Sequence, residues 1–333
     1  MKVLVTGATG LLGSNVVRIL LENGHHVKVF LRPSCNLVAL NGLDYEKTTG
    51  NLLNKRSIIK AATDCDVIIH AAANTSQCPT SYENYEPVNV NGTKNILEAA
   101  KILGTSKIVY VSTCNAIGFG SKTQPGNELT EFNSITGYSG YIFSKYIAQQ
   151  VVLNEVEKNK LPAVIVNPSF MIGKQDAKPS SGQVILMAYK KKILYYPSGG
   201  RNFIHVRDAA IGVYNAILNG RIGESYLLTN ENLSYKEFYN KVCLVAGMSP
   251  FKIKIPAFAI KPAGLINSIC SSMLKKSTQF NFANALLLTL GKYYSSNKAV
   301  KELNLPQTAV EQAIEDALEW FGRHGYLTRK HIG

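Results

Sequence analysis

The chain has 333 residues, 46% of them hydrophobic, and a formal net charge of +14. That length can bury a large core, either as one α/β unit or as a nucleotide-binding domain with a smaller appended one. No apolar run reaches the roughly 18 residues that a membrane span needs, so we expect no integral membrane segment. The first predicted strand starts at the N-terminus, so we also expect no signal peptide.

Charge and cysteine content narrow the class of protein further. The basic excess fits a solvated surface, which we favour, or attraction to anionic small molecules such as a phosphorylated cofactor, or a nucleic-acid or membrane surface. The lysines are spread out and no nucleic-acid-binding module is recognisable. The six cysteines are scattered without a C-x-x-C pair. We therefore expect a reduced, cytoplasmic protein with a small-molecule substrate and no metal site.

A glycine turn follows the first predicted strand. Residues 2–5 are a short valine-rich run typical of a buried strand, and apolar residues at helical spacing begin at Val16. Between them the spacing is G-x-x-G-x-x-G. Without Cβ atoms the backbone N–H groups can close on a pyrophosphate, whose charge then faces the helix dipole. The alternative is a plain glycine-rich βα turn. The cofactor contacts expected here are Gly7, Thr9, Gly10, Leu11, Leu12 and Gly13.

The end of the second strand, residues 27–31, bears on the choice of cofactor. NAD enzymes usually place a carboxylate here to bind the adenosine ribose, but the position holds Leu31. Arg32 follows, and its guanidinium suits a 2′-phosphate. The sequence therefore favours NADPH, with NAD as the alternative if Arg32 simply lies in solvent.

A further strand is predicted over residues 66–70 and runs into Ala71, Ala72 and Ala73. Small side chains at this strand end let a ribose and a pyrophosphate lie close to the backbone. His70 lies on the apolar strand and is expected to be a hydrogen-bonded core histidine.

The strand at 107–111 and a later helix carry the candidate chemistry. Tyr141 and Lys145 form a Y-x-x-x-K pair, and a spacing of four places both on one helical face. A tyrosine with a pKa near 10 is a poor acid or base at neutral pH, and an adjacent ammonium lowers that pKa. Thr113, after the strand, can complete a carbonyl site. Alone the pair is as consistent with a surface contact, but together with the glycine turn it favours catalysis.

In this order, these features resemble an extended (atypical) short-chain dehydrogenase/reductase of the NAD-dependent epimerase/dehydratase family. The chain is most similar to the dihydroflavonol-4-reductase-like and 3β-hydroxysteroid-dehydrogenase-like branch. The resemblance covers nearly the whole chain and includes residues 164–173, 202–210 and the tail over 295–321.

The resemblance assigns roles to individual residues. Tyr141 would give or take the hydroxyl proton, Lys145 would lower its pKa and orient the nicotinamide ribose, and Thr113 would bind the substrate oxygen. Asn51 stands where the family usually has an aspartate near the adenine. The further cofactor contacts that the resemblance implies are Asn51, Leu52, Ala71, Ala72, Ala73, Ser112, Tyr141, Lys145, Pro168, Ser169, Phe170 and Met171.

The substrate is less clear from the sequence. Arg201 occupies the place of a phosphate-binding arginine in sugar-nucleotide members of the family, but the Arg-Pro-Gly-Asp-like segment of those enzymes is absent. Arg201 and Asn115 are the candidate substrate contacts. The apolar segment 256–290 indicates either a lipophilic pocket or ordinary core, and a peripheral membrane helix there is unsupported.

Three functions remain open. The first is an NADP(H)-dependent oxidoreductase that reduces a ketone, or oxidises the alcohol, of a lipophilic or flavonol-like molecule. The second is a sugar or sugar-nucleotide epimerase/dehydratase with retained NAD(P). The third is a non-enzymatic nucleotide sensor, against which the Thr113, Tyr141 and Lys145 set argues.

The predicted architecture is an α/β Rossmann fold, with a doubly wound parallel sheet of roughly seven strands and a smaller, mainly helical substrate lobe. The NAD(P)-binding domain would comprise residues 1–166 plus 204–228, and the substrate-binding lobe 167–203 plus 229–333. The resemblance also implies a homodimer, formed through the helices that contain Asn91 and Tyr141.

Overall fold

The computed structural model describes residues 1–76, 78, 80–133, 139–273 and 281–327. Its centre is a seven-stranded, wholly parallel sheet in the order β10-β6-β5-β4-β1-β2-β3. The strands are β1 (Lys2–Thr6), β2 (His26–Leu31), β3 (Glu46–Thr49), β4 (Val67–His70), β5 (Lys107–Val111), β6 (Ala163–Pro168) and β10 (Ser225–Leu228). The strand order reverses direction beside β1, which confirms the predicted doubly wound Rossmann fold.

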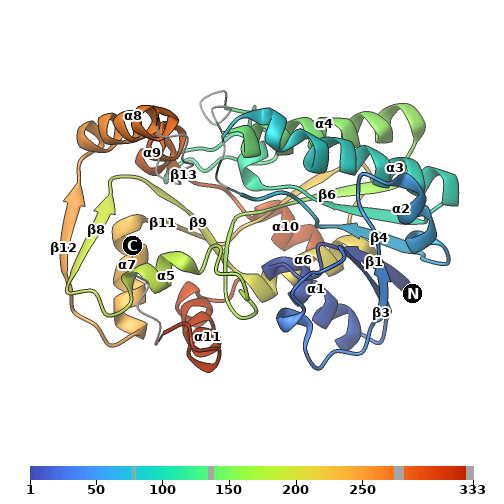
Figure 1. Ribbon diagram of the computed structural model, residues 1–333, viewed down its shortest axis with the longest axis horizontal. Coiled ribbons are helices and arrows are strands. Elements are labelled where there is room, and N and C mark those ends of the chain that lie inside the picture. Colours follow the sequence, from blue (N-terminus) through green and yellow to red (C-terminus); the bar gives the residue numbers. More distant parts are fainter. Residues whose placement is uncertain (77, 79, 134–138, 274–280, 328–333) are drawn as a thin grey trace.

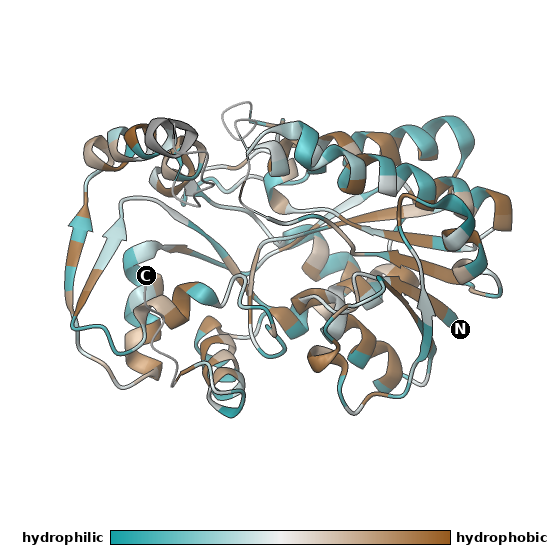
Figure 2. Ribbon diagram, in the orientation of Figure 1, coloured by the Kyte–Doolittle hydropathy of each residue, from teal (hydrophilic) through white to brown (hydrophobic). Residues whose placement is uncertain are grey.

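Helices cover both faces of this sheet (Figure 1). On one face α1 (Leu11–Glu22) and α6 (Val206–Leu218) pack on Val3 and Val5; on the other α2 (Lys55–Ala62), α3 (Gly92–Leu103) and α4 (Gly140–Asn159) pack on Leu4. Successive strand residues point to opposite faces. A continuous apolar run is therefore needed to bury both sides, as the apolar colouring of the central strands in Figure 2 illustrates.

The remaining segments build a smaller lobe beside the sheet (Figure 1). The remaining helices, of which all but α10 belong to this lobe, are α5 (Gln183–Ala188), α7 (Tyr235–Val245), α8 (Ala257–Met273), α9 (Phe282–Thr289), α10 (Asn297–Leu303) and α11 (Val310–Arg323). The lobe also contains strands, which the sequence analysis did not anticipate beyond the segments near 170 and 203. One sheet joins β7 (Phe170–Ile172), β9 (Gly200–His205), β11 (Glu231–Ser234) and β13 (Gly291–Lys292), and a ribbon joins β8 (Ile193–Pro197) to β12 (Phe251–Ile255).

The C-terminal helices do not all stay in this lobe. Ala299 and Leu303 of α10 lie in the same core as Val3 and Val5, and α10 packs on β10 and α6. Helix α11 instead packs on α7 and β9. The chain thus returns to the central sheet once more before it ends in the lobe.

Helices α8 and α9 pack on each other and contain most of the apolar segment noted over 256–290, of which residues 274–280 lie outside the described residues. Part of α8 faces solvent, with Phe258 80% exposed and Ile266 62% exposed. Across the described part of the chain, no helix is both long and apolar enough to cross a bilayer.

Candidate nicotinamide and substrate site

The glycine turn makes a close junction between β1, β4 and α1. Gly7 has φ +72°, and a Cβ there would lie 2.6 Å from the Ala72 backbone nitrogen. A Cβ on Gly13 would lie 2.2 Å from the Gly7 carbonyl oxygen, so only glycine fits. Gly10 is the N-cap residue of α1 and makes no side-chain cap, and the first turn of the helix carries no acidic residue. The free N–H groups and the positive end of the helix therefore suit an anion.

The residues predicted to surround the adenosine half lie at the ends of β2 and β3. Arg32 directly follows β2 and is exposed, and no hydrogen bond or ion pair within the described residues holds its side chain. Asn51 is exposed too, but its Oδ1 accepts a hydrogen bond of 3.0 Å from the Leu53 backbone N–H. An amide oxygen has two lone pairs, so Asn51 keeps one free. Leu52 is partly buried beneath α3, against Gly92.

The end of β4 is tied to β1 through side chains. Thr6 Oγ1 lies 2.8 Å from His70 Nδ1 and accepts a 3.2 Å hydrogen bond from the Ala72 N–H. His70 Nε2 lies 3.1 Å from Thr93 Oγ1, and burial lowers the pKa of His70 to about 3. The ring is thus a neutral core histidine, as predicted. Ala71 to Ala73 are partly exposed beside the glycine turn.

Thr113 is fixed at the end of β5 by polar side chains of β6 and α4. Asn167 is fully buried and donates hydrogen bonds to the Thr113 carbonyl at 2.9 Å and to Gln149 Oε1 at 2.8 Å. The Thr113 hydroxyl, 7% exposed, accepts from the Asn115 N–H at 3.3 Å and caps the short turn Cys114–Ala116. Helix α4 packs against this turn. Its first turns lie there, because Cys114 acts electrostatically on Tyr141 and Lys145 Nζ donates to the Val111 carbonyl at the end of β5.

Tyr141 stands in the first turn of α4, and several contacts fix where that helix starts. The Ser139 side chain caps it by accepting from the Ile142 N–H, and a Cβ on Gly140 would lie 2.3 Å from the Thr80 carbonyl oxygen. Ser144 donates to the Tyr141 carbonyl at 2.7 Å and accepts from Asn89 at 2.9 Å.

Lys145 is 3% exposed and lies beneath Tyr141 on the same helix. Its Nζ donates to the Val111 carbonyl at 2.7 Å and lies 4.4 Å from the centre of the Tyr110 ring. Burial lowers the pKa of Lys145 to about 7.

The pKa of Tyr141 differs from the sequence expectation. Burial, followed by the negative forms of Cys114 and Tyr85, raises the pKa of Tyr141 to about 12, whereas Lys145 was expected to lower it. The physical reason is that removal from water disfavours the phenolate, and this is the largest effect on Tyr141. Tyr141 is a protonated phenol at neutral pH, as a free tyrosine also is.

Residues after β6 lie between the main sheet and the lobe. Pro168 ends β6, while Phe170 and Met171 belong to β7, which pairs in parallel with β9. The Ser169 N–H donates to the Leu228 carbonyl at 3.0 Å, and Ser169 is 8% exposed. Phe170 faces the lobe, where the Arg201 guanidinium lies 4.4 Å from its ring centre.

The two predicted substrate residues join a polar cluster. Arg201 is partly buried and donates to the Tyr235 hydroxyl at 2.7 and 3.1 Å. Asn115 donates to Thr113 Oγ1 at 3.4 Å and accepts at 2.9 Å from Lys292 Nζ.

The residues fit a nicotinamide dinucleotide. The hydroxyls of Ser112 and Ser169 are buried at the ends of the neighbouring strands β5 and β6, and neither has a hydrogen-bond partner among the described residues. Orphaned buried hydroxyls are uncommon without a ligand or water. Together with the uncapped start of α1, they outline a polar path along the carboxyl ends of the strands. This is where ligands bind in open α/β sheets.

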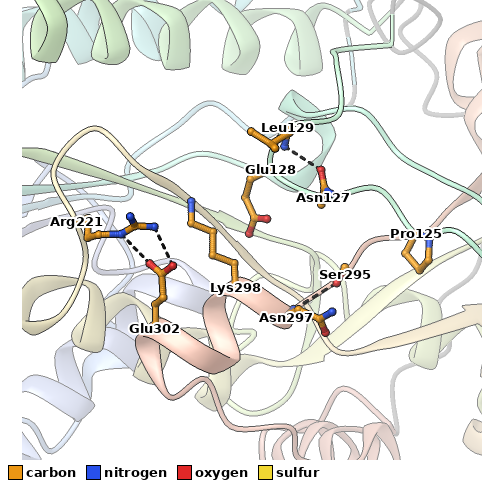
Figure 3. Close-up of a pocket in the computed structure, with 9 residues that line it drawn as sticks. All are labelled: Pro125, Asn127, Glu128, Leu129, Arg221, Ser295, Asn297, Lys298 and Glu302. Atoms are coloured by element: carbon orange, nitrogen blue, oxygen red, sulfur yellow. Dashed lines mark hydrogen bonds and ion pairs between the residues drawn. The ribbon is translucent and has the colours of Figure 1, made fainter.

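A separate hollow of about 570 Å³ lies away from these residues, between the loop at 125–129 and α10 (Figure 3). Its polar groups are already paired, as Arg221 with Glu302 at 2.8 Å and Lys298 with Glu224 at 2.6 Å. None of the predicted site residues lines it. The described part of the chain also holds no group of His, Cys, Asp and Glu that could bind a metal ion.

Sequence reasoning missed four residues of the site: Asn167, Gln149, Tyr235 and Lys292. Asn167 could have been noticed as the one polar residue within an apolar strand. Lys292 follows an apolar helix and has no local signal, because its partner Asn115 is 177 residues away.

Comparison with known proteins agrees with this geometry. The model of the NAD dependent epimerase/dehydratase family matches residues 3–228. A protein of Synechocystis sp., provisionally named dihydroflavonol 4-reductase, is 32% identical over 97% of this chain and 95% of its own. A 3-beta-hydroxysteroid dehydrogenase of Mycolicibacterium neoaurum is 26% identical over 96% of this chain and 91% of its own. The crystal structure of gox2253 superposes with a TM-score of 0.87 at 33% identity, covering 98% of this chain and 99% of that one. The chain therefore belongs to the NAD-dependent epimerase/dehydratase family and is an enzyme-type member with reductase and dehydrogenase relatives.

Proposed function

We propose that this protein is an NADP(H)-dependent oxidoreductase that reduces a ketone, or oxidises the matching alcohol, of a lipophilic or flavonol-like small molecule. The observation that carries the proposal is the meeting of Tyr141 and Lys145, in the first turns of α4, with the Thr113 turn at the end of β5. Relatives named as a reductase and a dehydrogenase over nearly the whole chain support the same reaction class.

Bound NADPH would supply the two electrons and one hydrogen of the reduction. The chain's own residues would then complete the reaction at the oxygen atom. Tyr141 is protonated at neutral pH, as any tyrosine with a pKa of 10 or above is, and donates its proton to the carbonyl oxygen. Burial raises its pKa to about 12, which makes it a weaker acid than a free tyrosine. The Thr113 hydroxyl donates a second hydrogen bond, and the buried Lys145 would hold the ribose hydroxyls of the cofactor. In the oxidation direction Tyr141 must first lose its proton, so alkaline pH favours that direction.

The cofactor part of the proposal has its own support. The uncapped start of α1 would bind the pyrophosphate. Arg32, exposed after β2 where an NAD enzyme would have a carboxylate, would bind the 2′-phosphate of NADP(H). The substrate part is supported by exposed apolar side chains of α8 such as Phe258 and Ile266.

A second function is favoured by the family itself. The family is named for NAD-dependent epimerases and dehydratases. In such an enzyme Arg201 would contact the diphosphate of a sugar nucleotide. Such an enzyme would keep its nicotinamide tightly bound and show no net redox.

The test is to add NADPH or NADH, separately, to the purified protein with a dihydroflavonol, a 3-oxosteroid and a straight-chain ketone. Consumption is followed by nicotinamide absorbance. We expect consumption with NADPH. Tyr141→Phe should lower kcat by about 10²- to 10⁴-fold without changing the NADPH Kd, and Tyr45→Phe serves as the matched control. Nicotinamide that survives dialysis, together with turnover of a sugar nucleotide only, would contradict the proposal.

We also propose the division of the chain and its assembly. Residues 1–166 plus 204–228 would bind the nucleotide, and 167–203 plus 229–333 would bind the substrate, with α10 packed back on the central sheet. A homodimer would form through α3 and α4, which lie side by side on one face of the sheet (Figure 1).

A further inference from the structure

Lys292 is a buried lysine that the reaction described above does not use. It is 5% exposed and is the second residue of β13, where it pairs in register with Arg201 of β9. Register partners on adjacent strands point to the same face of a sheet, so the two cationic side chains are neighbours. Among the described residues, neither forms an ion pair with a carboxylate.

A buried cation beside a partly buried one is costly unless an anion accompanies them. Burial, and then the Arg201 charge, lower the pKa of Lys292 to about 7. An ammonium has three donors, and the one acceptor found for Lys292 Nζ among the described residues is Asn115 Oδ1, at 2.9 Å. Arg201 directs two of its donors to the neutral hydroxyl of Tyr235. The pair thus has surplus positive charge and surplus donors.

The position of the pair relates it to the reacting group. The amide of Asn115 accepts from Lys292 with its oxygen and donates to Thr113 Oγ1 with its nitrogen, at 3.4 Å. One side-chain amide therefore separates the Lys292 ammonium from the hydroxyl assigned to the substrate oxygen. Arg201 lies over the ring of Phe170. An anion held by this pair would therefore lie on the side of Thr113 where Asn115 stands.

We propose that Lys292, together with Arg201, binds a carboxylate that the substrate carries close to its reacting carbon, as a 3-oxo acid or the corresponding 3-hydroxy acid does. This rests on the proposed oxidoreductase function, because it uses Thr113 as the contact of the reacting oxygen. Helix α9 leads directly into β13, so the apolar α8–α9 pair adjoins the carboxylate site along the chain. An alkyl tail on the acid would then follow these helices.

Binding is tested apart from turnover. The full chain, saturated with NADP⁺, is titrated calorimetrically with 3-hydroxydecanoate and with its methyl ester, which lacks the charge. We expect the acid to bind about tenfold or more tightly than the ester, as one charge-assisted hydrogen bond predicts. Lys292→Met should abolish this preference and Lys292→Arg should keep part of it. Lys60→Met, a change of an exposed lysine on α2, should leave the preference intact.

Equal binding of acid and ester by the wild type overturns the proposal, whether or not the variants fold. The proposal is also overturned if neither the acid nor the ester binds, or if a folded Lys292→Met protein still prefers the acid to the ester. The reaction is judged separately by nicotinamide absorbance. If acid binding depends on Lys292 but no alcohol or ketone is turned over, the carboxylate site stands and the oxidoreductase function falls.

Discussion

At the residue scale, two lysines are almost fully removed from water, Lys145 at 3% and Lys292 at 5% exposed. The pKa of each is lowered to about 7, in both cases mainly by burial. An ordinary lysine would be fully charged at neutral pH. At these two positions, therefore, a ligand's negative charge decides whether the side chain is an ammonium, which makes each of them sensitive to what is bound.

The first residue-scale prediction concerns pH and stability. Unfolded Lys292 binds a proton up to about pH 10.5, whereas folded Lys292 loses it near pH 7. Between these values the unfolded state holds more protons, so the free energy of unfolding rises with pH, by at most about 1.4 kcal/mol per pH unit for this group. The wild type should therefore gain stability relative to Lys292→Met between pH 7 and 9. Parallel urea-unfolding curves at each pH check this, and a constant difference would contradict the lowered pKa.

A second residue-scale prediction concerns Arg32. Arg32→Ala should weaken NADPH binding about tenfold, the effect of one charge-assisted contact with a phosphate, and leave NADH binding unchanged. Fluorescence titration with both nucleotides measures the two Kd values. Arg323→Ala, on α11, is the control for loss of charge alone. If the wild type prefers NADH, or if Arg32→Ala affects both nucleotides equally, Arg32 does not read the 2′-phosphate.

At the element scale, the junction of β1 and α1 shows how backbone geometry makes a site. Gly13 is required for packing, since a Cβ would lie 2.2 Å from the Gly7 carbonyl oxygen. Gly10 is required for another reason. Its φ of −82° suits any residue, and the atom nearest to a Cβ at this position would be 3.3 Å away. The lack of a side chain at Gly10 instead lets a ligand approach the start of α1.

These two glycines therefore predict different defects. Gly13→Ala should lower the melting temperature and abolish nucleotide binding, because the backbone contact cannot relax. Gly10→Ala should keep the melting temperature within a few degrees but weaken NADPH binding about tenfold, since the methyl group separates the phosphate from the helix dipole. Thermal unfolding and nucleotide titration separate the two effects. Wild-type affinity in Gly10→Ala would show that the pyrophosphate lies elsewhere.

At the scale of the whole molecule, the sheet and the lobe are joined by a few buried polar links. Asp208 in the first turn of α6 is 3% exposed and accepts from the Thr308 N–H at 2.7 Å and the Thr308 hydroxyl at 2.9 Å. His205 Nε2 lies 3.2 Å from Asp316 of α11. These contacts fix the segment that enters α11 against the helix that covers the sheet, and so hold the two sides of the site in register.

Loss of one link should therefore cost stability without touching the nucleotide. Asp208→Ala removes the acceptor of two partly buried donors of Thr308, which should lower the free energy of unfolding by about 1–3 kcal/mol. The NADPH Kd of the folded variant should stay unchanged. Urea unfolding checks the first expectation and titration the second, with Asp44→Ala, an exposed aspartate, as the control. If Asp208→Ala is as stable as the wild type, the hydrogen bonds between Asp208 and Thr308 do not stabilise the fold.

The sequence by itself determined the parts of this protein whose signals are local. A strand, a glycine turn and a helix follow one another within about twenty residues, and the spacing of Tyr141 and Lys145 places them on one helical face, so the Rossmann fold and the candidate catalytic set could be read directly. Tertiary structure alone decided the environment of those residues. It raised the pKa of Tyr141 through burial, and it brought Lys292 to Asn115 across 177 residues. Burial and long-range pairing depend on how distant elements pack, and periodicity within a segment contains no information about either.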